Sequence, residues 1–236
     1  MHLLLTRPQE DSRRSAEKLV AAGHRVTIAP VMRIVLPPGP DIAPDGCQAL
    51  VFSSSNAVRA FAARSAERDI RVFTVGDRSA RLAGDLGFAE VRSAAGDSAD
   101  LAALLARHLS PAGGPVLYLT GTHIATDLGN IPALGKFTIK REIVYEAKAL
   151  TTLSATCRQA LMGAEIGAVL FYSRRSAELF SALLGDYGIT PVLGTMTACC
   201  LAPRVAEGLR AADWAAIEVA ARPVEDSLLA LPALTR

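Results

Sequence analysis

Short apolar runs alternate along the chain with longer segments in which apolar residues recur every three to four positions. The short runs are typical of buried strands, and the longer period is typical of helices that pack on one face. The pattern predicts strands near residues 2–6, 25–29, 49–53, 71–75, 89–92, 115–119, 137–140, 168–172, 196–201 and 216–220. It predicts helices near residues 9–22, 55–67, 77–86, 97–109, 123–134, 154–163, 174–185, 203–211 and 224–231. Because strands and helices alternate, we expect an α/β fold with parallel sheets.

Two distant stretches carry nearly the same pattern. Residues 49–61 read ALVFSSSNAVRAF, and residues 168–180 read AVLFYSRRSAELF, with Ala, Phe and Ser in the same register. Residues 4–8, at the end of the first strand, likewise resemble residues 117–122. These matches predict an internal duplication, in which two similar lobes enclose an active-site cleft.

A proline-rich segment, residues 36–45, follows the first strand–helix–strand unit and is expected to connect the lobes. The extended segment 141–149 is expected to be the second connector. Each lobe could be contiguous in sequence, or the first unit could pair with the last third of the chain in a nested arrangement. A linker placed directly after the first unit favours nesting.

Composition narrows the class of protein. The chain has 236 residues, of which 50% are hydrophobic, and this is enough for two cores. Its 25 basic and 23 acidic residues are scattered and give a net charge of +2, which argues against a nucleic-acid partner. The N-terminal apolar run is too short for a signal peptide, and no run approaches the roughly 20 apolar residues of a membrane span. We therefore expect a cytoplasmic protein with no membrane partner.

No sequence motif indicates a cofactor or a metal. Glycine-rich nucleotide motifs, a nucleophile elbow and the His-Glu-x-x-His zinc motif are missing. The cysteines show no Cys-x-x-Cys spacing and are expected to be buried, small hydrophobic residues: Cys47, Cys157, Cys199 and Cys200. We expect no cofactor and no metal.

Small, hydroxyl-bearing and cationic residues follow several predicted strands. Ligands of open α/β sheets bind beyond the carboxyl ends of the strands, where helix N-termini present free N–H groups. The candidate binding residues at these corners are Arg7; Ser53, Ser54, Ser55 and Asn56; Gly76, Asp77, Arg78 and Ser79; Gly121 and Thr122; and Ser173, Arg174 and Arg175. Together they indicate a site for an anionic small molecule.

Structural roles would explain some of these residues equally well. Ser55 or Asn56 could be a helix N-cap, which typically contributes about 1 kcal/mol. Arg174 and Arg175 precede a helix, and the positive end of the helix dipole disfavours cations. A bound anion would offset this unfavourable electrostatic interaction. A salt bridge from this arginine pair to Glu178, on the next turn, is the alternative.

Five motifs together resemble the uroporphyrinogen-III synthase family, and the similarity extends over essentially the whole chain. They are LLLTRP at 3–8, VFSSSNAV at 51–58, VGDRSA at 75–80, IVYE at 143–146 and LFYS at 170–173. The resemblance implies the nested fold, with residues 1–35 and 150–236 in one lobe and residues 46–140 in the other. It also implies a cofactor-independent lyase that closes hydroxymethylbilane to uroporphyrinogen III, with loss of water and inversion of ring D.

The resemblance also implies roles for particular residues. Tyr145 matches the family's tyrosine in the returning connector, where it could protonate the departing hydroxyl; the alternative is a half-buried residue with only a packing role. Pro203 and Arg204 occupy a further binding corner that departs from the family's Gly and Thr pattern, and Arg204 could supply a cationic contact. We expect a monomer that binds a linear tetrapyrrole and makes at most transient contact with neighbouring pathway enzymes.

Two other classes of protein fit the same features. A bilobal small-molecule receptor would show the duplication and the hinge but would bind without turnover. A catalytically silent domain of the same fold would serve as an assembly partner. The intact Tyr145 and the hydroxyl-bearing corners favour the enzyme over both.

Overall fold

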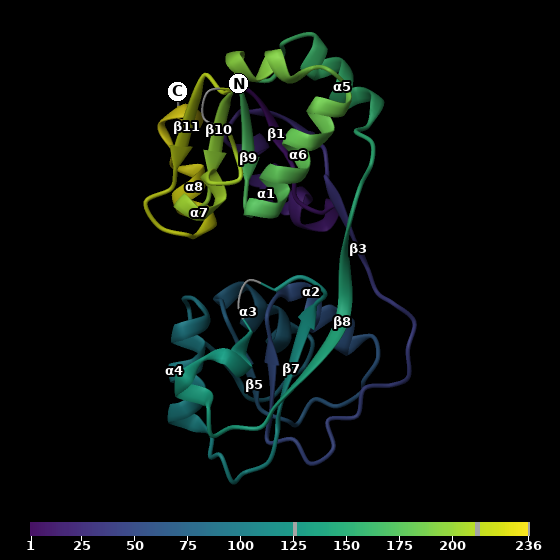
Figure 1. Cartoon of the computed structure of the whole chain (residues 1–236), viewed down its shortest axis with the longest axis vertical. Helices are drawn as coiled ribbons and strands as arrows, with labels where there is room; N and C mark the ends of the chain where they lie inside the picture. The colour runs from purple at the N-terminus through teal and green to yellow at the C-terminus, as the bar shows by residue number, and fades with distance from the viewer. Residues whose placement is uncertain (125–126, 211–212, 236) are drawn as a thin grey trace. The chain divides into compact units, whose positions relative to one another are not determined.

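The computed structural model describes residues 1–124, 127–210 and 213–235 (Figure 1). The chain divides into two compact units. Unit 1 contains Met1–Arg33 and Lys148–Arg236, and unit 2 contains Ile34–Ala147. No helix among the described residues is long and apolar enough to cross a membrane.

Unit 2 is built on a six-stranded sheet with the strand order β3-β8-β7-β4-β5-β6. Its strands are β3 (Met32–Val35), β4 (Ala49–Phe52), β5 (Val72–Thr74), β6 (Val91–Ser93), β7 (Val116–Gly121) and β8 (Ile139–Ala149). The pairs from β8 through to β6 are parallel. Strands β3 and β8 both continue across the division between the units.

The inner strands of unit 2, β4, β5 and β7, are buried on both faces. Successive side chains of β4 point to opposite faces, so Leu50 and Phe52 belong to one core and Ala49 and Val51 to the other. The first core also contains residues of α2 (Ser55–Ala62) and α3 (Asp77–Asp85). The second contains residues of α4 (Ser98–His108). Figure 1 shows these helices around the sheet.

Unit 1 is built on a five-stranded parallel sheet with the strand order β11-β10-β9-β1-β2. Its strands are β1 (His2–Leu5), β2 (Arg25–Ile28), β9 (Ala168–Phe171), β10 (Thr197–Cys200) and β11 (Ala216–Val219). Its helices are α1 (Gln9–Ala21), α5 (Ala155–Met162), α6 (Arg174–Asp186), α7 (Pro203–Ala206) and α8 (Glu225–Leu229).

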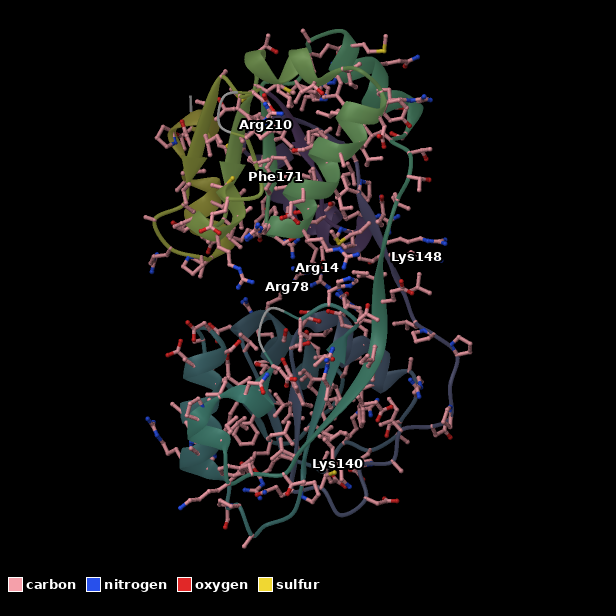
Figure 2. The ribbon with its side chains drawn as sticks, in the orientation of Figure 1. Arg14, Arg78, Lys140, Lys148, Phe171 and Arg210 are labelled. Carbon is pink, nitrogen blue, oxygen red and sulfur yellow. The ribbon has the colours of Figure 1, made fainter. Side chains whose placement is uncertain are left out.

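In unit 1, too, strand side chains that point to one face of the sheet form a core. Leu3 and Leu5 belong to one core cluster, which includes Leu228 of α8. Phe171 makes edge-to-face contacts with Phe180 and Trp214, at ring-centroid distances of 5.6 and 5.7 Å. Figure 2 shows Phe171 in the interior of this unit.

The sheet pairing is nested. β1 pairs with β9, and β4 pairs with β7. The first strand–helix–strand unit of the chain therefore shares a sheet with the last third. The order β2-β1-β9-β10-β11 in unit 1 corresponds to β8-β7-β4-β5-β6 in unit 2, as a duplication requires. The predicted fold class, α/β with parallel sheets in two similar units, is confirmed.

One predicted helix is wrong. The sequence predicts an α-helix near 123–134, but the described part of this segment contains two 3₁₀ turns, η1 (Leu128–Asn130) and η2 (Pro132–Leu134). Residues 125 and 126 lie outside the described residues. Pro132 lacks a backbone N–H, and Gly129 has low helix propensity, so an α-helix is not sustained here.

Two other predicted helices end early. α2 ends at Ala62 rather than near residue 67, because Arg68 donates hydrogen bonds to carbonyl oxygens at the end of this helix and in the following turn. The helix predicted at 203–211 is the short α7, which is followed by Gly208, a poor helix former. Residue 211 lies outside the described residues.

Further observations concern secondary structure within and near the segments expected to be connectors, whose connecting role stays a prediction. The strand predicted at 137–140 continues as β8 to Ala149, so most of the extended segment 141–149 belongs to the sheet. β3 and the 3₁₀ segment η3 (Thr190–Thr195) are not predicted from the sequence. The proline-rich segment 36–45 packs on unit 2 through Ile42, a buried residue whose N–H donates to the carbonyl oxygen of Arg64.

Candidate active site at the carboxyl edges of the two sheets

The predicted site residues follow the carboxyl ends of the parallel strands in each unit. In unit 2, Ser53 follows β4 and Gly76 lies just beyond β5, while Gly121 is the last residue of β7. Because these strands are parallel neighbours, their carboxyl ends share one edge of the sheet. We call this edge, with residues 53–56, 76–79, 121–122 and Tyr145, the hydroxyl edge.

An irregularity in β8 places Tyr145 at the hydroxyl edge. Thr120 pairs with Ile143, but Gly121 pairs with Tyr145, so β8 has one additional residue, Val144, at this point. Such a bulge changes the face to which the following side chains point. Val144 is fully buried, and Tyr145 lies half-buried against the same core.

The tyrosine is held at both ends. Its carbonyl oxygen accepts a hydrogen bond from the Thr122 N–H at 3.1 Å. Its hydroxyl oxygen accepts a hydrogen bond from the Ser54 hydroxyl at 3.0 Å. Arg141 donates to Thr120 Oγ1 at 3.1 Å and to the Gly121 carbonyl oxygen at 3.3 Å, which fixes the end of β7 beside the ring. The hydroxyl group of Tyr145 therefore has a defined position.

The serine cluster of this edge is mostly engaged within the protein. The hydroxyls of Ser55 and Ser79 are buried and lie 3.3 Å apart, which links the first turns of α2 and α3. Ser53 donates to the carbonyl oxygen of Leu119 at 3.3 Å. Asn56 accepts a hydrogen bond from Arg59. These contacts give the side chains structural roles and leave backbone N–H groups of the helix N-termini as the natural anion donors.

The cap of α2 is neither of the residues that the sequence favoured. Ser54 is the N-cap, and its Oγ accepts from the Ala57 N–H at 3.3 Å, whereas Ser55 is the first helical residue and Asn56 the second. The helix begins at residue 55, as expected, and the N-cap is the residue that precedes it. Gly76 is the N-cap of α3, and Asp77, an exposed residue, begins that helix beside Arg78.

The corresponding edge of unit 1 is cationic. Ser173 is the N-cap of α6, in the position equivalent to Ser54, and its Oγ accepts from the Ser176 N–H at 3.1 Å. Arg174, the first residue of α6, donates to Glu178 at 2.8 Å, as the salt-bridge alternative requires. We call the predicted residues of this edge, Arg7, Ser173, Arg174, Arg175, Pro203 and Arg204, the cationic edge.

The third corner of the cationic edge has no side-chain cap. Ala202 is the N-cap of α7 and cannot accept a hydrogen bond through its side chain. Pro203 occupies the first helical position, where a missing N–H costs nothing. Arg204 is exposed beside it. The corner can therefore offer a guanidinium group but no hydroxyl.

Arg7 belongs to an internal network of unit 1. Its guanidinium lies 3.6 Å from Asp11 and 3.5 Å from Glu225, and its Cζ lies 4.2 Å from the ring centroid of Tyr172. Glu225 also accepts from Ser15 at 2.5 Å. Two carboxylates and an aromatic ring already contact the Arg7 side chain, and these contacts give it a structural role. Its role in binding substrate stays a prediction.

The charges of this network shift two pKa values. Burial raises the pKa of Tyr172 to about 12, and the neighbouring charge of Glu225 adds to the shift. Burial opposes ionisation of Glu225, but hydrogen bonds from Ser15 and Lys18 and the charges of Lys18 and Arg7 outweigh it and lower its pKa. Tyr172 is thus neutral at physiological pH and Glu225 is charged.

Sequence reasoning missed this network because its members are far apart in the chain. Ser15 and Glu225 are separated by 210 residues, and neither belongs to a recognisable motif. The only sequence signals were the Tyr172 position in the LFYS motif and the acidic start of the last helix. The contact follows from the nested pairing, which brings α1 and α8 to one face of the sheet.

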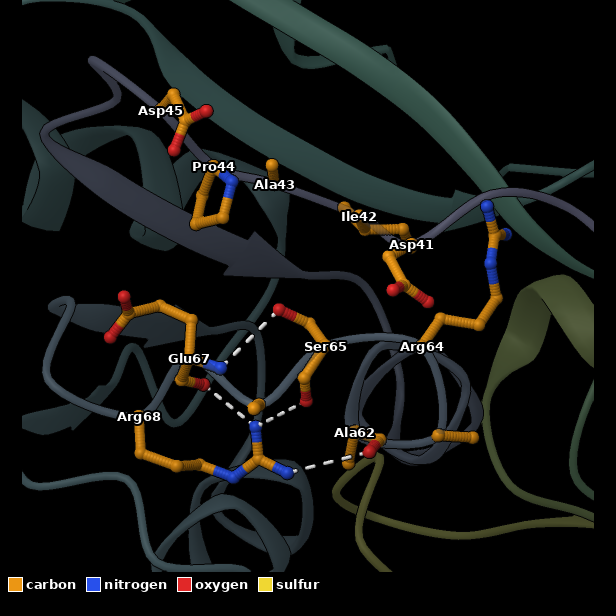
Figure 3. Close-up of a pocket in the computed structure, with 12 residues that line it drawn as sticks. Asp41, Ile42, Ala43, Pro44, Asp45, Ala62, Arg64, Ser65, Glu67 and Arg68 are labelled. Atoms are coloured by element: carbon orange, nitrogen blue, oxygen red, sulfur yellow. Dashed lines mark hydrogen bonds between the residues drawn. The ribbon is translucent and has the colours of Figure 1, made fainter.

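A cavity of about 540 Å³ lies elsewhere in unit 2 (Figure 3). It is lined by the segments 41–45 and 62–68, and its guanidinium groups are engaged with carbonyl oxygens. The predicted site residues are not part of its lining. This cavity results from the packing of the proline-rich segment beyond the end of α2 and does not belong to the candidate site.

Comparison with protein families decides the class of the chain. The model for uroporphyrinogen-III synthase HemD matches residues 13–230, which include nearly all of both edges. The chain belongs to the uroporphyrinogen-III synthase HemD family. Members of this family are hydro-lyases that take a linear tetrapyrrole as substrate. A search of curated proteins found no match.

Solved structures of this family share the fold. The chain is similar to uroporphyrinogen-III synthetase from Helicobacter pylori, with a TM-score of 0.68 and 19% identity over 100% of this chain and 99% of that chain. It is also similar to a mutant uroporphyrinogen III synthase from Thermus thermophilus, with a TM-score of 0.52 and 15% identity over 97% and 96% of the two chains. At these identities the likeness shows the fold.

Proposed function

We propose that this chain is a uroporphyrinogen-III synthase, which closes hydroxymethylbilane to uroporphyrinogen III with loss of water and inversion of ring D. Family membership supports the substrate class. The observation that carries the proposal is the placement of the Tyr145 hydroxyl at the hydroxyl edge, 3.0 Å from Ser54 and beside the first turn of α2.

The reaction requires a departing hydroxyl and a controlled attack. The bond between the ring A methylene carbon and its hydroxyl oxygen breaks, and the pyrrole nitrogen supplies electrons to the resulting azafulvene. Tyr145 donates a proton to the departing oxygen, which leaves as water. The substituted carbon of ring D then attacks the methylene carbon, and a spiro intermediate rearranges so that ring D is inverted. In this step the protein mainly orients the two ends of the bilane.

Binding relies on the acetate and propionate groups of the bilane. The N-termini of α2, α3 and α6 present N–H groups without intrahelical acceptors, and these suit carboxylates. Arg174 and Arg204 of the cationic edge add positive charge for the same groups. We propose that residues of both edges hold carboxylates and that the protein acts as a monomer.

The product isomer tests the proposal. Freshly prepared hydroxymethylbilane is added to the purified protein, the products are oxidised, and type I and type III porphyrins are separated by chromatography. We expect isomer III in excess without added metal or cofactor. Isomer I alone, as in a control without protein, would reject the proposal in favour of a binding or silent domain.

A further inference from the structure

Gly121 lies directly against the ring of Tyr145. A Cβ atom built on Gly121 would lie 2.7 Å from Cζ, 2.8 Å from Cε2 and 3.0 Å from the hydroxyl oxygen of Tyr145. Carbon atoms in contact normally lie about 3.5–4.0 Å apart. Any residue larger than glycine at position 121 would therefore push the outer half of the ring away from its present place.

The bulge in β8 creates this close approach. Gly121 is paired with Tyr145 only because β8 contains one more residue than β7 between the two adjacent pairs. In the regular register Gly121 would instead face Val144, which is buried in the core. The local backbone of β8 and the missing side chain of Gly121 thus act together to seat the tyrosine ring.

Ser54 determines the direction of the hydrogen bond at the other end of the ring. Its Oγ accepts from the Ala57 N–H at 3.3 Å, as the cap of α2, and donates its own proton to the Tyr145 hydroxyl oxygen at 3.0 Å. A phenol that accepts from serine keeps its own O–H proton for another acceptor. The cap of α2 therefore leaves the Tyr145 proton available for transfer.

We propose that Gly121 and Ser54 are positioning residues that make Tyr145 the proton donor, rather than contacts for substrate carboxylates. The inference rests on the proposed function. As the carbon–oxygen bond breaks, the Tyr145 proton passes to the departing oxygen, and water and a tyrosinate remain. The Ser54 hydroxyl and the positive end of α2 stabilise that tyrosinate. The proton lost from the free α-carbon of ring D, when its pyrrole regains aromaticity, restores the tyrosine.

Gly121→Ala is the first test. The atoms that the new methyl group would meet belong to the outer part of a side chain, so the ring can swing aside and the thermal midpoint of unfolding should change little. The hydroxyl would leave Ser54, and kcat for isomer III should fall by about 100-fold, as for loss of a general acid, with KM nearly unchanged. The matched control is Gly84→Ala on α3, where a Cβ meets nothing within 4 Å and activity should be unaffected.

Two Ser54 variants provide the second test, which does not depend on Gly121→Ala folding. Ser54→Ala should lower kcat about tenfold with KM unchanged, and Ser54→Thr, which keeps the hydroxyl, should restore most of it. Ser154→Ala is the matched control, because Ser154 caps α5 through the Cys157 N–H at 3.2 Å and is exposed. It should lose a similar amount of stability and no activity.

The outcomes separate this inference from the proposed function. If the wild-type protein forms no isomer III, the proposed function fails. If the wild-type protein is active and folded Gly121→Ala keeps its kcat, or raises only KM, the positioning role is wrong. If Gly121→Ala does not fold, the two Ser54 variants provide the test. An equal fall of kcat in Ser54→Ala and Ser54→Thr would overturn the inference. A kcat that is largely restored in Ser54→Thr would support it.

Discussion

The hydroxyl edge of unit 2 and the cationic edge of unit 1 are built on the same strand order, but they carry different chemistry. Equivalent serines, Ser54 and Ser173, cap the first helix after equivalent strands, β4 and β9. Ser54 donates onward to a tyrosine, whereas Ser173 donates to Ser176 on its own helix. The duplicated backbone has therefore kept its caps while the groups around them have changed.

Features shared by the two edges are structural, whereas features found at one edge alone are candidates for function. Capping is common to both units and follows from the orphan N–H groups of any helix start. Tyr145 and Gly121 have no equivalent in the sequence of the cationic edge, where Arg7 occupies the position that corresponds to Gly121. Under the proposed function, we therefore propose that unit 2 carries the proton transfer and that unit 1 holds carboxylates.

Removal of the Tyr145 hydroxyl should have the largest effect on activity. We expect Tyr145→Phe to lower kcat for isomer III by about 100-fold or more, with little change in KM, because the variant binds substrate but lacks the acid. Steady-state kinetics with separation of the isomers measures this. Tyr187→Phe, in unit 1, is the control and should keep its activity. If kcat were unchanged in Tyr145→Phe, Tyr145 would not be the proton donor, and the hydroxyl edge would have no chemical role that the cationic edge lacks.

Removal of charge from the cationic edge should mainly weaken binding. We expect the double variant Arg174→Gln and Arg204→Gln to raise KM about tenfold and leave kcat nearly unchanged, since the lost groups attract carboxylates before and during the reaction. The effect should shrink at high salt. Lys140→Gln, near the amino end of β8 (Figure 2), is the control for loss of a positive charge outside both edges, and each single arginine variant is compared with it. A fall in kcat with constant KM would contradict the assignment.

The two caps should contribute similarly to stability. We expect Ser54→Ala and Ser173→Ala each to lower the free energy of unfolding by about 1 kcal/mol, because each removes a hydroxyl that accepts a helix N–H. Urea unfolding of both variants measures the effect. If neither variant lost stability, the two serines would not stabilise their helices as caps.

Acid should weaken the network around Glu225 in unit 1. A carboxyl group whose pKa is lowered on folding adds stability above its ordinary pKa of 4.5 and loses it as pH falls through the lowered value. We therefore expect Glu225→Gln to be less stable than the wild-type protein at pH 7, with the gap narrowing as pH falls to about 3. Denaturant unfolding at several pH values tests this, and a constant gap would exclude the lowered pKa as the cause.

The fold could largely be predicted from the sequence because hydrophobic periodicity reports burial. The apolar runs at 49–52 and 168–171 predict two inner strands, and the structure confirms them as the fully buried β4 and β9. The predicted boundaries were wrong where side chains bind the backbone, as at the end of α2, where Arg68 of the following turn donates to the carbonyl oxygen of Ala62. β3 has mixed burial and no clear period, so its residues did not stand out.

The site could be predicted only in part. The corner residues could be placed after the strands from sequence because strand ends and helix starts have compositional signals, and their role in binding stays a prediction. The Tyr145 and Ser54 contact joins residues that are 91 apart, and it depends on a bulge, which leaves no mark in the hydrophobic pattern. The Arg7 network likewise depends on which elements share a face, and one sequence does not contain that information.

Amide hydrogen exchange with and without uroporphyrinogen III is the sharpest test of the proposal that each edge binds carboxylates of the ligand. The first N–H groups of α2, α3 and α6 have no intrahelical acceptor and should exchange fast in the free protein. We expect slower exchange on binding at Ser55, Asn56, Asp77 and Arg174. Unchanged exchange at the first turn of α6, with protection confined to unit 2, would contradict the role of the cationic edge.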